Sequence, residues 1–280
     1  MLGANGMLGS EILSKFSEEK NVEILPCYRS LLEVDNYGRY KARFQKLVSD
    51  YRPDYVINCV VINHRRRTIS GVMQQMVVNG IFPRFVAKQS KIHHYFMVQV
   101  STDGVFFGKK GGYVESSRRY PRNLYSLSKI IGEVRSESVL IIRCSIIGKT
   151  KVNHKVSSLL TWFANQKQNS SVDGYTNHLW NGVTTDYLAK LISGIVNNGY
   201  KVGGVQHFIP VDVLAKSELL ELFRRVLHRL DIAVRPIPAS QSLRRNLSTQ
   251  YPDKNQLFWR LTGLPYVPSI SELLNRTFPQ

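Results

Sequence analysis

The sequence predicts an α/β protein with a doubly wound parallel sheet, followed by a smaller C-terminal lobe. The first 150 residues alternate short apolar runs with helical patterns, which is typical of βαβ units. A glycine-rich turn opens the chain, and the alternation is lost after about residue 150. With 280 residues and 43% hydrophobic content, the chain can bury a large core.

The elements of the first half follow from the spacing of apolar residues. We expect helices where they recur every three or four positions and strands where they run together. The helices are predicted at 8–16, 40–51, 74–89 and 125–134, and the strands at 22–25, 55–61, 95–100 and 139–143. Pro83 is expected to kink or break the third helix, because proline removes a backbone donor.

The second half has a different rhythm. A helix at 156–166 and a polar stretch at 169–181 precede a helix at 185–196, a strand at 205–209, a helix at 216–230 and a loop-rich, proline-containing tail. We therefore expect one domain over residues 1–150 and a lobe over residues 151–280, with a segment at about 180–210 returning to the first domain. A ligand crevice is expected at the carboxyl ends of the parallel strands.

The formal net charge of +18 is unusual and predicts a field that attracts anions. The basic residues form short separate clusters at Arg65–Arg67, Lys109–Lys110, Arg118–Arg119, Arg224–Arg225 and Arg244–Arg245. Solvated surface charge is the favoured interpretation, with attraction of phosphate-bearing ligands second. Nucleic-acid binding is not expected, because no basic stripe interleaved with aromatic residues accompanies the clusters.

The three cysteines, Cys27, Cys59 and Cys144, lie in apolar runs without a C-x-x-C pair. They predict buried, reduced thiols in a cytoplasmic protein. No apolar run approaches the roughly 18 residues of a membrane span, and no signal peptide is visible. The histidines lack ligand spacing, so no metal site is predicted.

The glycine turn indicates a nucleotide-binding site of the Rossmann type. Glycines at G-x-x-G-x-x-G spacing allow a tight turn, close approach of backbone N–H groups to a pyrophosphate, and close packing of the following helix. The cofactor-binding residues predicted here are Gly3, Gly6, Met7, Leu8 and Gly9.

Only Met1 and Leu2 precede this turn, whereas a central strand usually has about five residues. We expect either a very short first strand or a chain that starts several residues earlier.

The end of the second predicted strand indicates which dinucleotide binds. An acidic residue there would bind a ribose hydroxyl, whereas an arginine accommodates a 2′-phosphate. Arg29 with Ser30 therefore favours NADPH over NADH. Glu33 and Val34 are expected to approach the adenine.

The next strand ends at Asn58, Cys59 and Val60. These small or apolar residues are expected to form the floor of the cofactor site, although an ordinary buried strand explains each of them nearly as well.

The catalytic prediction rests on Thr102, Tyr125 and Lys129. Tyr125 and Lys129 are four residues apart, so a helix places them on one face. Tyrosine is a weak acid with a pKa near 10, and a nearby ammonium lowers that pKa toward the working pH. Tyr125 can then donate a proton to a ketone oxygen that Thr102 holds, while Lys129 also binds the nicotinamide ribose.

The residues expected to contact a substrate are Ser101, Thr102, Asp103, Gly104 and Val105, together with Trp180 from the polar stretch. For Trp180, packing between lobes is an equally good interpretation.

Together these motifs resemble the extended short-chain dehydrogenase/reductases, and most closely the dTDP-4-dehydrorhamnose reductases. The matching stretches are Gly3–Gly9, Pro53–Cys59, Ser101–Phe106, Asn123–Lys129 with Gly132 and Glu133, and Gly182–Ala189. The resemblance implies NADPH-dependent reduction of a 4-keto-6-deoxy sugar nucleotide in deoxysugar or surface-polysaccharide synthesis. It also implies an NADP-binding Rossmann domain, a lobe that binds the nucleotide sugar, and Thr102, Tyr125 and Lys129 as the catalytic trio.

The chain departs from the family pattern at three places. Gly104 stands where the family usually has tyrosine, and Ser145–Gly148 replaces a Trp-Val-Tyr-Gly run whose tryptophan lies near the sugar. Arg65–Arg67 replaces a usually more acidic stretch and is expected to face the crevice and an anionic substrate. The identity of the sugar therefore stays open.

Two alternatives remain. A sugar-nucleotide epimerase or dehydratase of the same superfamily is less favoured, because dehydratases commonly carry an acidic pair where this chain has Asp103 and Gly104. A non-catalytic NADP-binding regulatory subunit is disfavoured by the complete trio. A homodimer stays open.

Overall fold

The computed structural model describes residues 1–19, 21–28, 32–33, 39–63, 68–149 and 158–279. The chain forms two compact units. The first unit comprises Met1–Phe107, Ser117–Arg143 and Ile192–Gln206, and the second comprises Gly108–Ser116, Cys144–Leu191 and His207–Gln280.

A four-stranded sheet forms the centre of the first unit. Its strands are β1 (Tyr55–Asn58), β2 (Phe96–Ser101), β3 (Val139–Arg143) and β8 (Gly204–His207), in the order β1-β2-β3-β8. The β1–β2 and β2–β3 pairs are parallel. Because nearly every residue of β1, β2 and β3 is buried, both faces of the sheet are covered.

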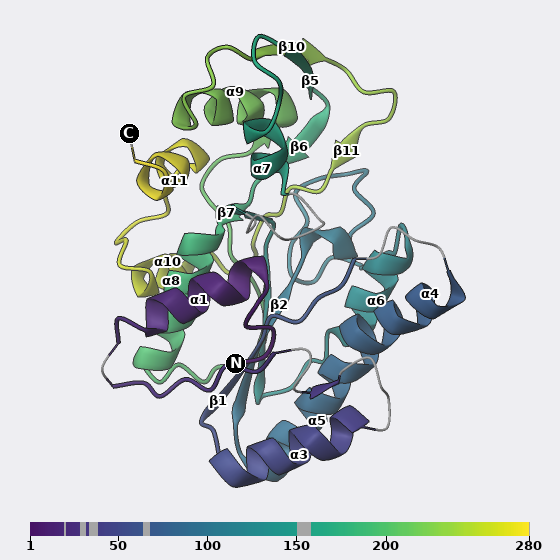
Figure 1. Ribbon diagram of the computed structural model, residues 1–280, viewed down its shortest axis with the longest axis vertical. Coiled ribbons are helices and arrows are strands. Elements are labelled where there is room, and N and C mark those ends of the chain that lie inside the picture. Colours follow the sequence, from purple (N-terminus) through teal and green to yellow (C-terminus); the bar gives the residue numbers. More distant parts are fainter. Residues whose placement is uncertain (20, 29–31, 34–38, 64–67, 150–157, 280) are drawn as a thin grey trace. The chain divides into compact units, whose positions relative to one another are not determined.

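Helices cover the sheet from two sides. Figure 1 shows α1 (Met7–Phe16) on one side and α3 (Arg39–Tyr51), α5 (Phe82–His93) and α6 (Leu124–Gly132) on the other. This arrangement confirms the predicted doubly wound α/β fold. Within the second group of helices, the ring of Tyr40 on α3 meets that of Phe82 on α5 edge to face at 5.3 Å.

The strand order reverses at Leu2. Its backbone bridges in parallel to Cys27 on one side and to Asn58 on the other. The N–H of Leu2 donates to the carbonyl of Ile57, and the N–H of Gly3 donates to that of Cys27. Leu2 therefore occupies the topological switch point, beyond which ligands bind in open parallel sheets.

The long helix predicted over 74–89 is interrupted. α4 (Ile69–Met76) passes into a π-helical turn, η1 (Val77–Ile81), and then into α5. Pro83 lies in the first turn of α5, where its missing N–H costs little, and the irregular turn lies just before it.

The second unit is built from short strands and helices. β5 (Ser171–Tyr175) pairs with β10 (Ala233–Ile237), β6 (His178–Trp180) lies between β9 (Leu214–Ala215) and β11 (Leu243–Arg244), and β4 (Ile146–Ile147) pairs with β7 (Val183–Thr184). The remaining helices are α7 (Leu159–Ala164), α8 (Thr185–Asn197), α9 (Lys216–Val226), α10 (Pro252–Leu261) and α11 (Ile270–Thr277), of which α8 continues into the first unit.

Three predictions of secondary structure from the sequence were wrong. Residues 22–25 form no strand, and the bridge on this side of Leu2 is at Cys27. The polar stretch at 169–181 contains β5 and β6, and the tail expected to be loop-rich contains α10 and α11. The strand over 55–61 is real but ends at Asn58.

Candidate active site

The glycine turn follows the switch point directly. Gly3 has φ +85°, which favours glycine, and a β-carbon there would lie 3.0 Å from the backbone carbon of Cys59. A β-carbon on Gly9 would overlap the carbonyl oxygen of Gly3. Gly6 is the N-cap of α1 and offers no side chain to the first N–H groups of that helix. The turn therefore leaves backbone donors and space for a phosphate group.

The strand end beside the turn is held by Asn58. Cys59 is only half-buried there, whereas Cys27 and Cys144 are buried as predicted. Asn58 is fully buried, where its Nδ2 donates to Oε1 of Gln99 at 2.8 Å and its Oδ1 accepts from the N–H of Val60 at 3.1 Å. The Asn58 side chain thus stabilises the sheet, and Cys59 is the residue that meets the glycine turn. Burial raises the pKa of the Cys59 thiol to about 12, so it stays protonated near neutral pH.

The other predicted cofactor residues are placed in part. Met7 and Leu8 form the first turn of α1, with Leu8 buried. Glu33 accepts ion pairs from Arg39 at 3.3 Å and Arg43 at 2.8 Å, so α3 holds its carboxylate. Outside the described residues lie Arg29, Ser30, Val34 and the basic run Arg65–Arg67.

Thr102 and Tyr125 converge on Gly104. Thr102 directly follows β2 and is the N-cap of a single 3₁₀ turn, η2 (Asp103–Val105), where its Oγ1 accepts from the N–H of Gly104 at 3.0 Å. The Thr102 hydroxyl donates to Oδ1 of Asp103 at 3.0 Å. A β-carbon on Gly104 would lie 3.3 Å from Thr102 Oγ1 and 3.6 Å from Tyr125 Cε1. The hydroxyl-bearing residues from the strand end and the helix are therefore neighbours, and Val105 is buried beneath them.

Lys129 lies one turn after Tyr125 on α6. It is 5% exposed, and its Nζ donates to the carbonyl oxygen of Val100 at 2.9 Å. Its charge also opposes the rise in the pKa of Cys59. The structure thus brings the predicted cofactor turn and the predicted catalytic trio into one unit.

The start of α6 is fixed by a capping box, in which the side chain of Asn123 accepts from the N–H of Ser126 at 2.9 Å. Buried Asn79, in the π-helical turn η1, binds both the N–H and the carbonyl of Ile62 and donates to Oγ of Ser128. The irregular turn thereby supplies a side chain that bonds α6 at Ser128, the residue directly before Lys129. Sequence reasoning missed this role.

A buried charged cluster, also missed, lies behind the trio. Glu133, the C-cap of α6, accepts from Arg143 Nε at 2.8 Å, from Arg143 Nη2 at 2.7 Å and from Arg119 Nη1 at 3.0 Å. The hydroxyl of Ser101 donates to the same carboxylate at 2.6 Å. Ser101, which we expected to contact substrate, is buried and points to Glu133 instead.

Trp180 lies in the second unit and is buried in its hydrophobic core with Phe163 and Phe223. Its indole N–H donates to Oγ of Ser145 at 2.7 Å, and Lys216 Nζ lies 5.5 Å from its ring centroid. Packing accounts for all of these contacts.

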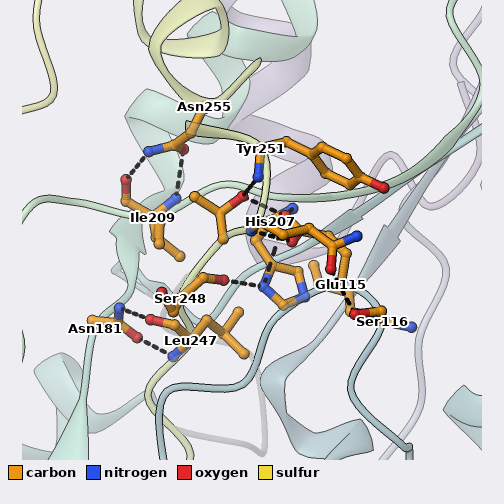
Figure 2. Close-up of polar contacts among 12 residues, drawn as sticks. Glu115, Ser116, Asn181, His207, Ile209, Leu247, Ser248, Tyr251 and Asn255 are labelled. Carbon is orange, nitrogen blue, oxygen red and sulfur yellow. Dashed lines mark hydrogen bonds and ion pairs between the residues drawn. The ribbon is translucent and has the colours of Figure 1, made fainter. Parts of the chain in front are cut away.

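A second buried carboxylate organises the loops of the second unit (Figure 2). Glu115 accepts from the N–H of His207 at 3.0 Å, the hydroxyl of Thr249 at 2.7 Å and the N–H of Gln250 at 3.0 Å. Burial alone would raise the pKa of Glu115, but these hydrogen bonds and the charge of His207 lower it. His207 Nδ1 lies 2.6 Å from the carbonyl oxygen of Ser248, which can only accept, so Nδ1 carries a proton. The cluster joins segments that are distant in sequence.

A cavity of about 500 Å³ lies at the amino end of β1, lined by residues that include Met1, Leu25 and Tyr55. Thr102, Tyr125 and Lys129 do not line it. Ligands of parallel sheets bind beyond the carboxyl ends of the strands, and this cavity lies at the opposite end of β1.

Two further features of the described residues bear on function. They include no helix that is both long and apolar enough to cross a membrane. Nor do they bring three His, Cys, Asp or Glu side chains together in a group that could hold a metal ion.

Comparison with known proteins decides the family. The model of the family described as RmlD substrate binding domain matches residues 1–257. The chain belongs to the RmlD substrate binding domain family. Among curated members, a dTDP-4-dehydrorhamnose reductase of Streptomyces griseus is 25% identical over 99% of this chain and 91% of its own length.

Two further likenesses bear on the RmlD family assignment. A crystal structure of the dTDP-4-dehydrorhamnose reductase of Bacillus anthracis in complex with NADP has a TM-score of 0.78 and 23% identity, over 99% of this chain and 96% of that one. At this identity the likeness establishes the fold alone. The β subunit of methionine adenosyltransferase 2 of Xenopus laevis is 28% identical, but over only 47% of this chain and 40% of its own length.

Proposed function

We propose that this protein is an NADPH-dependent reductase of a nucleotide-linked 4-keto-6-deoxy sugar, acting in deoxysugar or surface-polysaccharide synthesis. The observation that supports the proposal is that Thr102 and Tyr125 meet at Gly104 while Lys129, one turn after Tyr125, bonds the backbone of β2, in the same unit as the glycine turn. The reductase of Streptomyces griseus, which aligns over nearly the whole chain, supports the substrate class.

The glycine turn fits a dinucleotide. Gly3, Gly6 and Gly9 leave room for a pyrophosphate at the start of α1, where no side chain caps the helix. Arg29, by the sequence argument, would bind a 2′-phosphate. The complex of the Bacillus anthracis reductase with NADP is consistent with that choice. Bound NADPH supplies the hydride for reduction of the ketone carbon.

The protein supplies the proton and the orientation. Thr102 holds the ketone oxygen near the Tyr125 hydroxyl, and that hydroxyl donates its proton to the oxygen as the carbon is reduced, so the ketone becomes an alcohol. Lys129 stabilises the resulting phenolate, because an ammonium nearby favours the charged form. Its hydrogen bond to the carbonyl of Val100 fixes the ammonium in place.

The alternative from another class is a regulatory subunit that binds NADP without turnover. The partial likeness to the β subunit of methionine adenosyltransferase 2 is the observation that favours it. The test is NADPH oxidation with dTDP- and UDP-linked 4-keto-6-deoxy sugars, alongside thermal shifts with dTDP, UDP, GDP and CDP in the presence of NADPH. Turnover supports the reductase, whereas cofactor binding without any nucleotide shift or turnover supports the regulatory subunit.

A further inference from the structure

We propose that Glu133 is a positioning residue, which holds α6 in register against β2 so that Lys129 and Tyr125 meet Thr102. The inference rests on the proposed reductase function and adds a residue that touches neither substrate nor cofactor. It acts with Arg143 and Ser101, and these three residues are called the clamp below.

Two neighbouring hydrogen bonds connect the end of α6 to β2, and the clamp supplies one of them. Glu133 follows Lys129 by four residues, so both lie on one face of the end of α6. Lys129 donates to the carbonyl of Val100, and Ser101, the next residue of β2, donates to Glu133. Sliding α6 by one turn would break both bonds together.

Burial makes the clamp stiff. Arg143 is 0% exposed, and its Nε and Nη2 both bind the carboxylate of Glu133. A bidentate contact between an arginine and a carboxylate fixes the relative orientation of the two side chains as well as their distance. A buried guanidinium without a carboxylate partner destabilises the folded protein strongly. The ion pair between Arg143 and Glu133 therefore opposes separation of α6 from β3.

The clamp also joins the strand that precedes Thr102 to the helix that carries Tyr125 and Lys129. Arg143 ends β3, Ser101 directly precedes Thr102, and Glu133 caps the helix that carries Tyr125. Arg119 donates both to Glu133 and to the carbonyl of Ile130 in α6, which fixes the same helix end from the preceding loop. A misplacement of about 1 Å can cost about 10²-fold in rate, so this register matters for the chemistry.

The decisive variant is Ser101→Ala, because it removes the link to β2 and leaves the ion pair with Arg143 intact. Its matched control is Thr249→Ala, which removes the equivalent hydroxyl bond to the buried carboxylate of Glu115 in the second unit. Melting temperatures measured for both variants allow comparison at equal loss of stability. Glu133→Gln is a harsher version of the test, but it leaves Arg143 unpaired and can fail to fold.

The readout is the pKa of the Tyr125 phenol in the NADP-bound protein. It is obtained as the tyrosinate absorbance of each protein minus that of the same protein carrying Tyr125→Phe, so no sugar substrate is required. We expect Ser101→Ala to raise this pKa toward about 10, the ordinary value for tyrosine, since the end of α6 is then held less firmly against β2 and Lys129 moves relative to Tyr125 and Thr102. With a sugar substrate, kcat should fall by about 10- to 100-fold while NADPH affinity changes less than about threefold.

The outcomes are distinguishable. An unchanged phenol pKa and kcat in Ser101→Ala, with the same loss of melting temperature as Thr249→Ala, would show that Glu133 serves stability alone and overturn the proposal. A wild-type Tyr125 that titrates near 10 would instead contradict the proposed function, and with it any need for positioning.

Discussion

The ammonium of Lys129 donates a 2.9 Å hydrogen bond to the backbone carbonyl of Val100, two residues before Thr102. The same carbonyl accepts from Nε2 of Gln99 at 3.0 Å. The lysine is therefore tied to the strand that directly precedes Thr102, whose hydroxyl we propose binds the substrate.

Lys129→Met should abolish most of the catalytic power without unfolding the protein. Methionine fills the buried volume, and Gln99 still satisfies the carbonyl of Val100. Without the ammonium, the pKa of Tyr125 should return toward about 10, so activity should fall by about 10²–10⁴-fold near neutral pH and recover partly at high pH. A pH–rate profile measures this. A profile parallel to that of the wild type would contradict the role of Lys129.

Gly9→Ala should impair cofactor binding. A β-carbon there overlaps the carbonyl oxygen of Gly3, so the turn must move away from the helix start. We expect NADPH affinity to fall by at least about tenfold, because the backbone donors no longer converge on the pyrophosphate. Ser10→Ala, one residue further along α1, is the control, since its hydroxyl only returns to the carbonyl of Met7. Fluorescence titration with NADPH compares the two, and equal affinities would rule out the predicted phosphate site.

We expect the contribution of Glu133 to the free energy of unfolding to be lost in acid. Burial alone would raise its pKa, but the hydrogen bonds and charge of Arg143 lower it below the ordinary value of 4.5. A carboxyl with a lowered folded-state pKa contributes stability above its unfolded pKa and loses it as pH falls through the folded value. The free energy of unfolding should therefore differ between wild type and Glu133→Gln by about 3–5 kcal/mol at neutral pH, and by progressively less below pH 4.5.

Urea denaturation of both proteins at a series of pH values measures this difference. If it stays constant down to the acid limit of folding, Glu133 is not ionised and paired as the structure shows.

Trp180 should behave as a core residue. Its ring packs in the hydrophobic core of the second unit, so Trp180→Ala should cost about 3–5 kcal/mol of stability. Ser145→Ala removes only the hydrogen bond to the indole and should cost about 1–3 kcal/mol. Unfolding experiments on the two variants measure both values. A Trp180→Ala protein of normal stability with a raised KM for the sugar nucleotide would support the substrate-lining role that the sequence suggested.

The parts of the site that were predictable depend on local patterns. Gly3, Gly6 and Gly9 mark the turn through spacing alone, and Tyr125 and Lys129 mark one helix face in the same way. Thr102 was indicated by its place at the end of an apolar run. In each case the physical requirement acts over a few residues, so it is visible in a single sequence.

The parts that were missed depend on contacts between distant segments. Glu115 and His207 are 92 positions apart, and Asn79 reaches Ser128 across 49 positions. One signal was available for the clamp, since Arg143 directly ends an apolar strand and a charge in that position needs a buried partner. The partner itself could not be identified from spacing.

The second unit was hard to predict for a different reason. β5 alternates exposed and buried residues, and its polar face carries Asp173, which pairs with Arg235 of β10 at 2.7 Å. Short half-exposed strands of this kind look like polar loops in sequence.

The central claim is that this protein reduces a nucleotide-linked 4-keto sugar with Tyr125 as the proton donor. The most direct measurement is the rate of NADPH oxidation with a dTDP-linked 4-keto-6-deoxy sugar, for wild type and Tyr125→Phe. We predict turnover by the wild type, and a fall of about 10²–10⁴-fold in the variant with NADPH affinity preserved, because only the hydroxyl is lost. A Tyr125→Phe protein that turns over within a few-fold of the wild type would contradict the claim.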